Sequence, residues 1–84
     1  MILNCIGIYE DEDTREVARL PTRLLYRQIE SWFGSIDPAS GRDITVVTMR
    51  SGDVHEILIP LGQFDRLMID YFHQESARNG FFAN

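Results

Sequence analysis

The chain has 84 residues and a formal net charge of −5, with 13 acidic residues against 8 basic residues, all of which are arginine. This length predicts a single domain over residues 1–84 with a modest core, and no apolar stretch is long enough to cross a membrane. The acidic balance argues against a protein whose main task is to hold a phosphate backbone, because such binding requires clustered positive charge.

The single cysteine, Cys5, lies in an apolar run and has no partner for an internal disulfide. We therefore predict a buried thiol, a reducing compartment and a cytoplasmic location. The N-terminal apolar run has no basic region before it and no small-residue cleavage site after it, so we predict no signal peptide.

The first predicted element is a strand over residues 2–9, ILNCIGIY, which is apolar on both faces and therefore typical of a central position. Gly7 within it indicates a bulge or a close backbone approach. Residues 10–20 allow two interpretations. A turn over 10–14 can lead into a strand over 15–20, or a helix capped at Asp13 can run to Pro21.

A helix is predicted next, over residues 22–33, with Gly34 just past its end. Leu25, Ile29 and Trp32 would form its buried stripe, because spacings of four and three place side chains on one side of a helix.

A hairpin is predicted over residues 44–59, because two runs rich in branched side chains flank Ser51-Gly52, which can form a two-residue turn. That turn places Met49 opposite Val54 and Val46 opposite Ile57. Since strand side chains alternate, one face carries the better core candidates. These are Ile44, Val46, Thr48, His55, Ile57 and Ile59. The other face carries Thr45, Val47, Met49, Val54, Glu56 and Leu58.

After Pro60 the apolar spacing changes to that of a second helix, which would end near Gly80. The apolar stripe of this helix consists of Phe64, Leu67, Met68, Tyr71 and Phe72.

The two halves of the chain match when they are aligned as hairpin, proline and helix, which predicts an internal ββα repeat. The halves are residues 1–34 and 43–80, joined by a linker over 35–42. The predicted fold class is α+β with the order ββαββα, a four-stranded antiparallel sheet carrying two helices on one face. A βαββα fold with three strands is the alternative, and a Pro-kinked helix over 14–33 is the main rival of the repeat.

This arrangement leaves more apolar surface than two helices can cover, which is typical of a partner-binding surface. We therefore predict a small protein-interaction or regulatory module without catalytic activity that self-associates, with a dimer as the expected state. The residues predicted to bind the partner are Val47, Met49, Val54, Leu58, Ile69, Phe81 and Phe82.

Two alternatives have weaker support in the sequence. Arg15, Arg19, Arg23 and Arg27 recur every four residues and would form a nucleic-acid-binding column on a continuous helix, which Pro21 opposes.

The second alternative is an enzyme built around His55, which would need a carboxylate or Cys5 within hydrogen-bonding distance. We expect no cofactor and no metal, because the two histidines and Cys5 lack metal-ligand spacing and the acidic run over 10–13 lacks the calcium-loop pattern.

Overall fold

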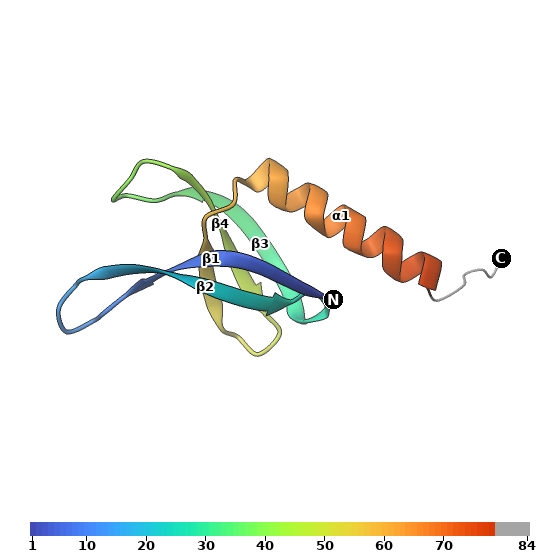
Figure 1. Cartoon of the computed structure of the whole chain (residues 1–84), viewed down its shortest axis with the longest axis horizontal. Coiled ribbons are helices and arrows are strands. Elements are labelled where there is room, and N and C mark those ends of the chain that lie inside the picture. Colours follow the sequence, from blue (N-terminus) through green and yellow to red (C-terminus); the bar gives the residue numbers. More distant parts are fainter. Residues whose placement is uncertain (79–84) are drawn as a thin grey trace.

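A computed structural model describes residues 1–78 of the chain, which form five strands, a short 3-10 helix and one α-helix (Figure 1). In chain order these are β1 (Ile2–Glu10), β2 (Val17–Leu25), the 3-10 helix η1 (Tyr26–Gln28), β3 (Ile29–Ile36), β4 (Asp43–Met49), β5 (Val54–Ile57) and α1 (Leu61–Arg78). The strands form one antiparallel sheet in the order β2-β1-β5-β4-β3.

The predicted ββαββα fold with four strands and two helices is therefore wrong, and so is the three-stranded βαββα alternative. Among residues 1–78 the single α-helix is α1, which follows all five strands. The first half of the chain supplies three strands without an α-helix, so the ββα repeat is also wrong. The predicted linker over 35–42 consists of the end of β3 and the turn that leads to β4.

The predicted helix over 22–33 is replaced by the end of β2, η1 and most of β3. The reason is long-range pairing, since β1 pairs with β2 from Ile2↔Leu25 to Glu10↔Val17 and satisfies its backbone groups. Thr22 and Leu24 are buried and alternate with exposed neighbours, which is the period of a strand. The strand interpretation of residues 15–20 is thus correct from Val17 onward, where β2 begins, and the capped helix and the Pro-kinked helix are wrong.

The β4–β5 hairpin is present, but its register differs by one residue from the prediction. Val46 lies opposite Glu56 and Val47 opposite His55. The loop has three residues instead of two: the Met49 N–H donates to the Asp53 carbonyl oxygen at 2.8 Å, and Gly52 has a φ of 96°. A three-residue loop with a left-handed glycine is a common hairpin form. Because of this one-residue shift, each set of β4 side chains shares its face of the sheet with the opposite set of β5 side chains from the one predicted.

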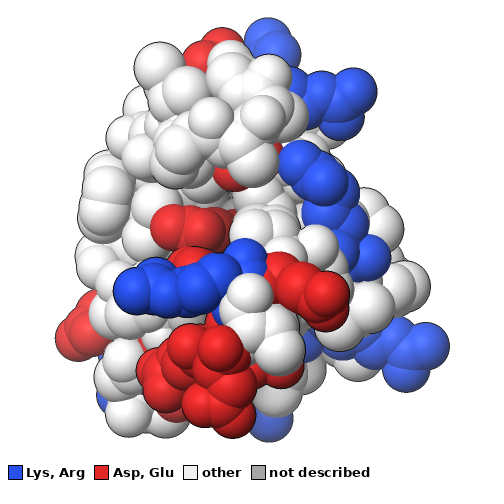
Figure 2. All heavy atoms as spheres, turned by 90° about the vertical axis from the view of Figure 1, so that its left-hand side faces the viewer, with Lys and Arg blue, Asp and Glu red and all other residues white. Residues whose placement is uncertain are grey.

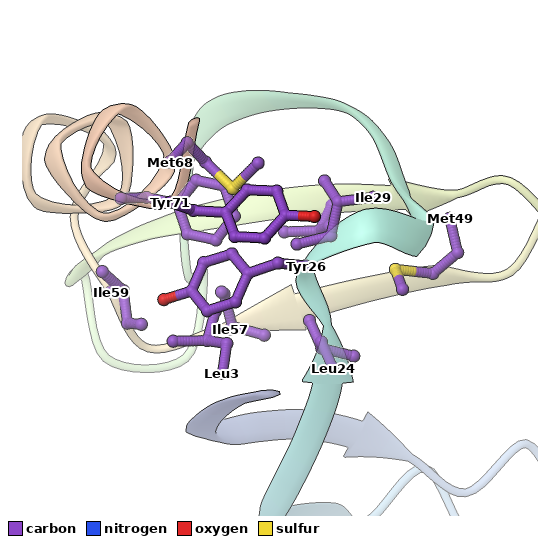
Figure 3. Packing of buried hydrophobic residues seen from close by; sticks show 11 residues of the cluster. Leu3, Leu24, Tyr26, Ile29, Met49, Ile57, Ile59, Met68 and Tyr71 are labelled. Carbon is purple, nitrogen blue, oxygen red and sulfur yellow. The ribbon is translucent and has the colours of Figure 1, made fainter. Parts of the chain in front are cut away.

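The core lies between the sheet and α1. Phe64 and Met68 of α1 are fully buried there, together with Val47 and Ile57 of the sheet. Tyr26, which η1 carries, lies under Tyr71 of α1 with a ring-centroid distance of 4.8 Å (Figure 3). The chain between β2 and β3 therefore contributes a buried aromatic ring to the core instead of a helix.

Candidate interaction site at the free edge of β3

Within residues 1–78 the sheet has two free edges, β2 and β3, because each of these strands has one neighbour in the strand order. The Tyr26 N–H donates to the Met1 carbonyl oxygen, and this hydrogen bond determines which residues of β2 direct their backbone groups toward β1. Since backbone groups alternate in direction along a strand, the nitrogen of Pro21 points outward and gives the edge no donor. Arg19 and Arg23 flank that gap. Proline and charged side chains are the usual protection of an edge against pairing.

The β3 edge lacks this protection. The Asp37 N–H donates to the Arg42 carbonyl oxygen at 2.8 Å, just beyond the β3–β4 ladder. By alternation, Ser31, Phe33 and Ser35 direct their backbone groups toward β4. The free backbone groups at the edge are those of Trp32, Gly34 and Ile36. Residues 31–36, SWFGSI, contain neither a charged residue nor a proline. We call this segment the β3 edge.

The side chains of the β3 edge divide between the two faces of the sheet. Trp32 faces α1, and its Nε1–H donates to the Asp65 carboxylate at 2.8 Å. Phe33 therefore faces away from the helix and is 58% exposed, and Ile36 at the end of the strand is 61% exposed. The β3 edge thus combines unpaired backbone groups with two exposed apolar side chains.

A groove of about 670 Å³ adjoins the edge, between the second half of β3, the first residues of β4 and the beginning of α1. Leu61 of α1 closes one side of it and approaches Gly34 so tightly that a Cβ on Gly34 would lie 3.1 Å from the Leu61 Cβ. The lining residues are Gly34, Ser35, Ile36, Asp43, Ile44, Pro60, Leu61 and Gly62. A strand added to the edge would place side chains over this groove.

The carboxylate of Asp37, which follows the β3 edge, is already paired with groups of the same chain. Asp37 is buried and accepts hydrogen bonds from the Ser40 hydroxyl at 2.6 Å and from the Arg19 guanidinium at 3.1 Å. The hydrogen bond from Ser40, followed by the backbone N–H of Ala39 and by Arg19, holds the pKa of Asp37 below its ordinary value. Asp37 therefore keeps its charge paired within the chain.

The residues predicted to bind a partner are scattered. Val47 and Met49 belong to the core beneath α1, while Val54 on β5 and Ile69 on α1 are 60% and 51% exposed. Leu58 is half-buried. Phe81 and Phe82, like the predicted stop at Gly80, lie outside the described residues. By alternation from Val47 and its partner His55, Val54 faces away from α1, which carries Ile69, so these residues do not form one surface.

The four arginines of the alternative site do not form a column, because the helix that would align them is absent. Arg15 pairs with Glu10 and Arg19 with Asp37, at 3.2 and 3.1 Å. Figure 2 shows acidic residues gathered at the bottom of this end of the molecule and basic groups along its upper right side. The acidic groups on the same face oppose phosphate binding, which requires clustered positive charge.

His55 lines a pocket of about 300 Å³ that also contains Met49 and Asp53. Its Nδ1 is buried without a hydrogen-bond partner in residues 1–78, so no acid–base pair is formed there. Burial raises the pKa of the Cys5 thiol, and the thiol contacts the Thr22 carbonyl oxygen. Over the described range, no group of three or more His, Cys, Asp or Glu side chains could hold a metal ion.

Sequence reasoning missed the β3 edge, because it assigned Trp32 and Phe33 to a helix and Ser35 and Ile36 to a linker. The signal that indicates a strand here is the uncharged run over 31–36, which contains two aromatic residues and the branched residue Ile36. That signal is weak beside the helical spacing of Leu25, Ile29 and Trp32.

Comparisons with protein-family models, with curated proteins and with solved structures find no match for this chain. None of the helices in residues 1–78 is long and apolar enough to span a membrane.

Proposed function

We propose that this protein is a protein-interaction module that accepts an extended, uncharged strand of a partner at the β3 edge. The observation that carries the proposal is the contrast between the two sheet edges. The β2 edge is interrupted by an outward proline and flanked by two arginines. The β3 edge presents free backbone groups beside Phe33 and Ile36, which are more than half exposed.

Addition of a partner strand would supply both affinity and selectivity. Backbone hydrogen bonds to Trp32, Gly34 and Ile36 would provide affinity, and the adjoining groove would select alternate side chains of the partner strand. Pairing would also cover the exposed side chain of Phe33. No catalytic step belongs to this proposal.

The test selects extended peptides from a random display library on the immobilised chain and follows binding of the winners by amide NMR. We expect the selected peptides to protect the N–H groups of Trp32, Gly34 and Ile36 from exchange, because these groups would gain partners. Peptides that bind but protect other amides would contradict the proposal.

The matched variants are Phe33→Lys and Val54→Lys, since the two side chains are 58% and 60% exposed and both lie on strands. Phe33→Lys should weaken peptide binding at least about tenfold by adding an edge charge, and Val54→Lys should leave it unchanged. The reverse order of effects would place the binding surface on the sheet face that the sequence predicted.

A further inference from the structure

We infer that the occupant of the β3 edge is the β3 edge of a second copy of this chain, paired antiparallel about a twofold axis that passes through Phe33. The inference rests on the proposed function, because it names the partner of that same edge. The pairing would continue the antiparallel sheet from one copy into the other.

The directions of the backbone N–H and C=O groups of β3 favour this twofold axis. Phe33 directs its N–H and C=O to β4, so across the new edge it occupies a pair without hydrogen bonds, where opposite side chains lie closest. Trp32 and Gly34, whose backbone groups are free, then form the hydrogen-bonded pairs on either side of the axis. A twofold axis through Phe33 therefore satisfies both copies equally.

The side chains of the two copies are also complementary across this axis. With Phe33 opposite Phe33 of the other copy, Ser31 lies opposite Ser35 and Trp32 lies opposite Gly34. The pairs are then aromatic with aromatic and hydroxyl with hydroxyl, and both kinds of pair stabilise neighbouring strands. Leu61 of the same copy already lies over Gly34, so the pair of Trp32 with Gly34 contributes backbone hydrogen bonds and no side-chain packing.

Charge also favours pairing of two copies through the β3 edge. Each copy carries a net charge of −5, so two copies repel each other, and contact through a neutral segment adds the least to that repulsion. The β3 edge has no charged residue. By contrast, pairing of two β2 edges would bring Arg19 and Arg23 of both copies together at an edge that Pro21 already interrupts.

The first measurement is the solution mass by sedimentation over a concentration series. We expect twice the 9.7 kDa mass of the chain at micromolar concentration and above. Phe33→Lys and Ser35→Lys should each raise the dissociation constant at least about tenfold, because they place lysines beside the axis. Val54→Lys should have no such effect. Ser35 is exposed, so this variant keeps the test valid if Phe33→Lys fails to fold.

The second measurement is charge rescue. Phe33→Lys and Phe33→Glu should each be monomeric alone, and an equal mixture should form the 1:1 heterodimer, because opposite charges then face each other at the axis. A mixture that stays monomeric would overturn the pairing through Phe33.

The third measurement is cross-linking in a Cys5→Ala background. The double variant Ser31→Cys/Ser35→Cys should form disulfide-linked dimers on oxidation, since each new thiol faces its counterpart in the other copy. Each single cysteine variant should not. Dimers that never cross-link in the double variant would overturn this register.

The outcomes separate the inference from the proposed function. A chain that remains monomeric at all concentrations, yet binds selected peptides at the β3 edge, overturns the inference and leaves the proposed function in place. A monomer that also binds no peptide there overturns both.

Discussion

Gly7 shows how one residue in β1 depends on its neighbours across the strand. A Cβ at this position would lie 2.5 Å from Oγ1 of Thr22 and 2.8 Å from the hydroxyl of Tyr9. Those two oxygens are themselves hydrogen-bonded at 2.6 Å. The sequence predicts a bulge or a close backbone approach at Gly7, but the β1–β2 pairing is regular there and the groups that approach it are side chains. The space that the glycine leaves is filled by the Tyr9 side chain.

Gly7→Ala should therefore lower the free energy of unfolding by about 1–3 kcal/mol, because the added methyl group overlaps a hydrogen-bonded pair. Chemical denaturation provides the measurement. Gly62→Ala in α1 is the control, since a Cβ added there would meet no packed neighbour within 4 Å, and it should be neutral or slightly stabilising. Equal losses in both variants would refute the packing argument.

Asp37 is the residue whose ionisation we expect to influence stability. Its pKa is lowered in the folded chain, with the hydrogen bond from Ser40 as the first cause. A carboxyl with a depressed folded-state pKa stabilises the fold at pH values above its unfolded-state pKa of about 4. That contribution is lost as the pH falls through the folded-state pKa.

Asp37→Asn should accordingly lower the melting temperature at pH 7 and reduce the further loss of stability as the pH falls below about 4. Thermal unfolding at a series of pH values tests this. Asp13→Asn, which removes one exposed carboxyl from the β1–β2 turn, serves as the control. An Asp37→Asn curve that runs parallel to the wild-type curve would contradict the assignment.

At the scale of the element, α1 is held to the sheet by one side only. Phe64 is fully buried and lies edge-on to Trp32 at 5.6 Å, whereas Phe72, two turns later, is 51% exposed. The helical spacing predicted both as stripe residues. The sheet beneath α1 buries Phe64, Met68 and Tyr71 but leaves Phe72 half-exposed, so the predicted stripe is wider than the buried one.

Phe64→Ala should lower the free energy of unfolding by about 3–5 kcal/mol, because it leaves a cavity in the core. Phe72→Ala should cost about 1 kcal/mol or less, since half of the side chain is already in water. Urea unfolding of both variants makes the comparison. Similar losses would mean that the end of α1 packs as tightly as its beginning.

For the whole molecule, the net charge opposes self-association. The proposed dimer meets through a neutral segment, so salt should strengthen it by screening the repulsion between two chains of charge −5. We expect the dissociation constant measured by sedimentation to fall as NaCl rises from about 20 to 300 mM. An interface built on ion pairs would weaken with salt instead. The sign of the salt effect on the dissociation constant therefore separates a neutral interface from one built on ion pairs.

Sequence patterns alone were sufficient to place the N-terminal strand, the pair of strands after residue 43 and the C-terminal helix, because each has a strong local signal. Branched residues around Gly52 favour a hairpin, and the spacing from Phe64 to Tyr71 favours a helix. These features depend on residues that are close together in the sequence, so they can be predicted without knowledge of the tertiary structure.

Tertiary structure decided between the two interpretations of residues 17–20, and it alone decided the conformation of residues 21–36 and the register of the β4–β5 hairpin. Pairing with β1 supplies the backbone hydrogen bonds that make residues 17–25 a strand, although Leu25, Ile29 and Trp32 have helical spacing. A loop one residue longer than expected places Val47 on the same face of the sheet as Ile57, and both side chains are fully buried. The β3 edge exists because β3 ends the strand order, and strand order is set by contacts between residues far apart in sequence.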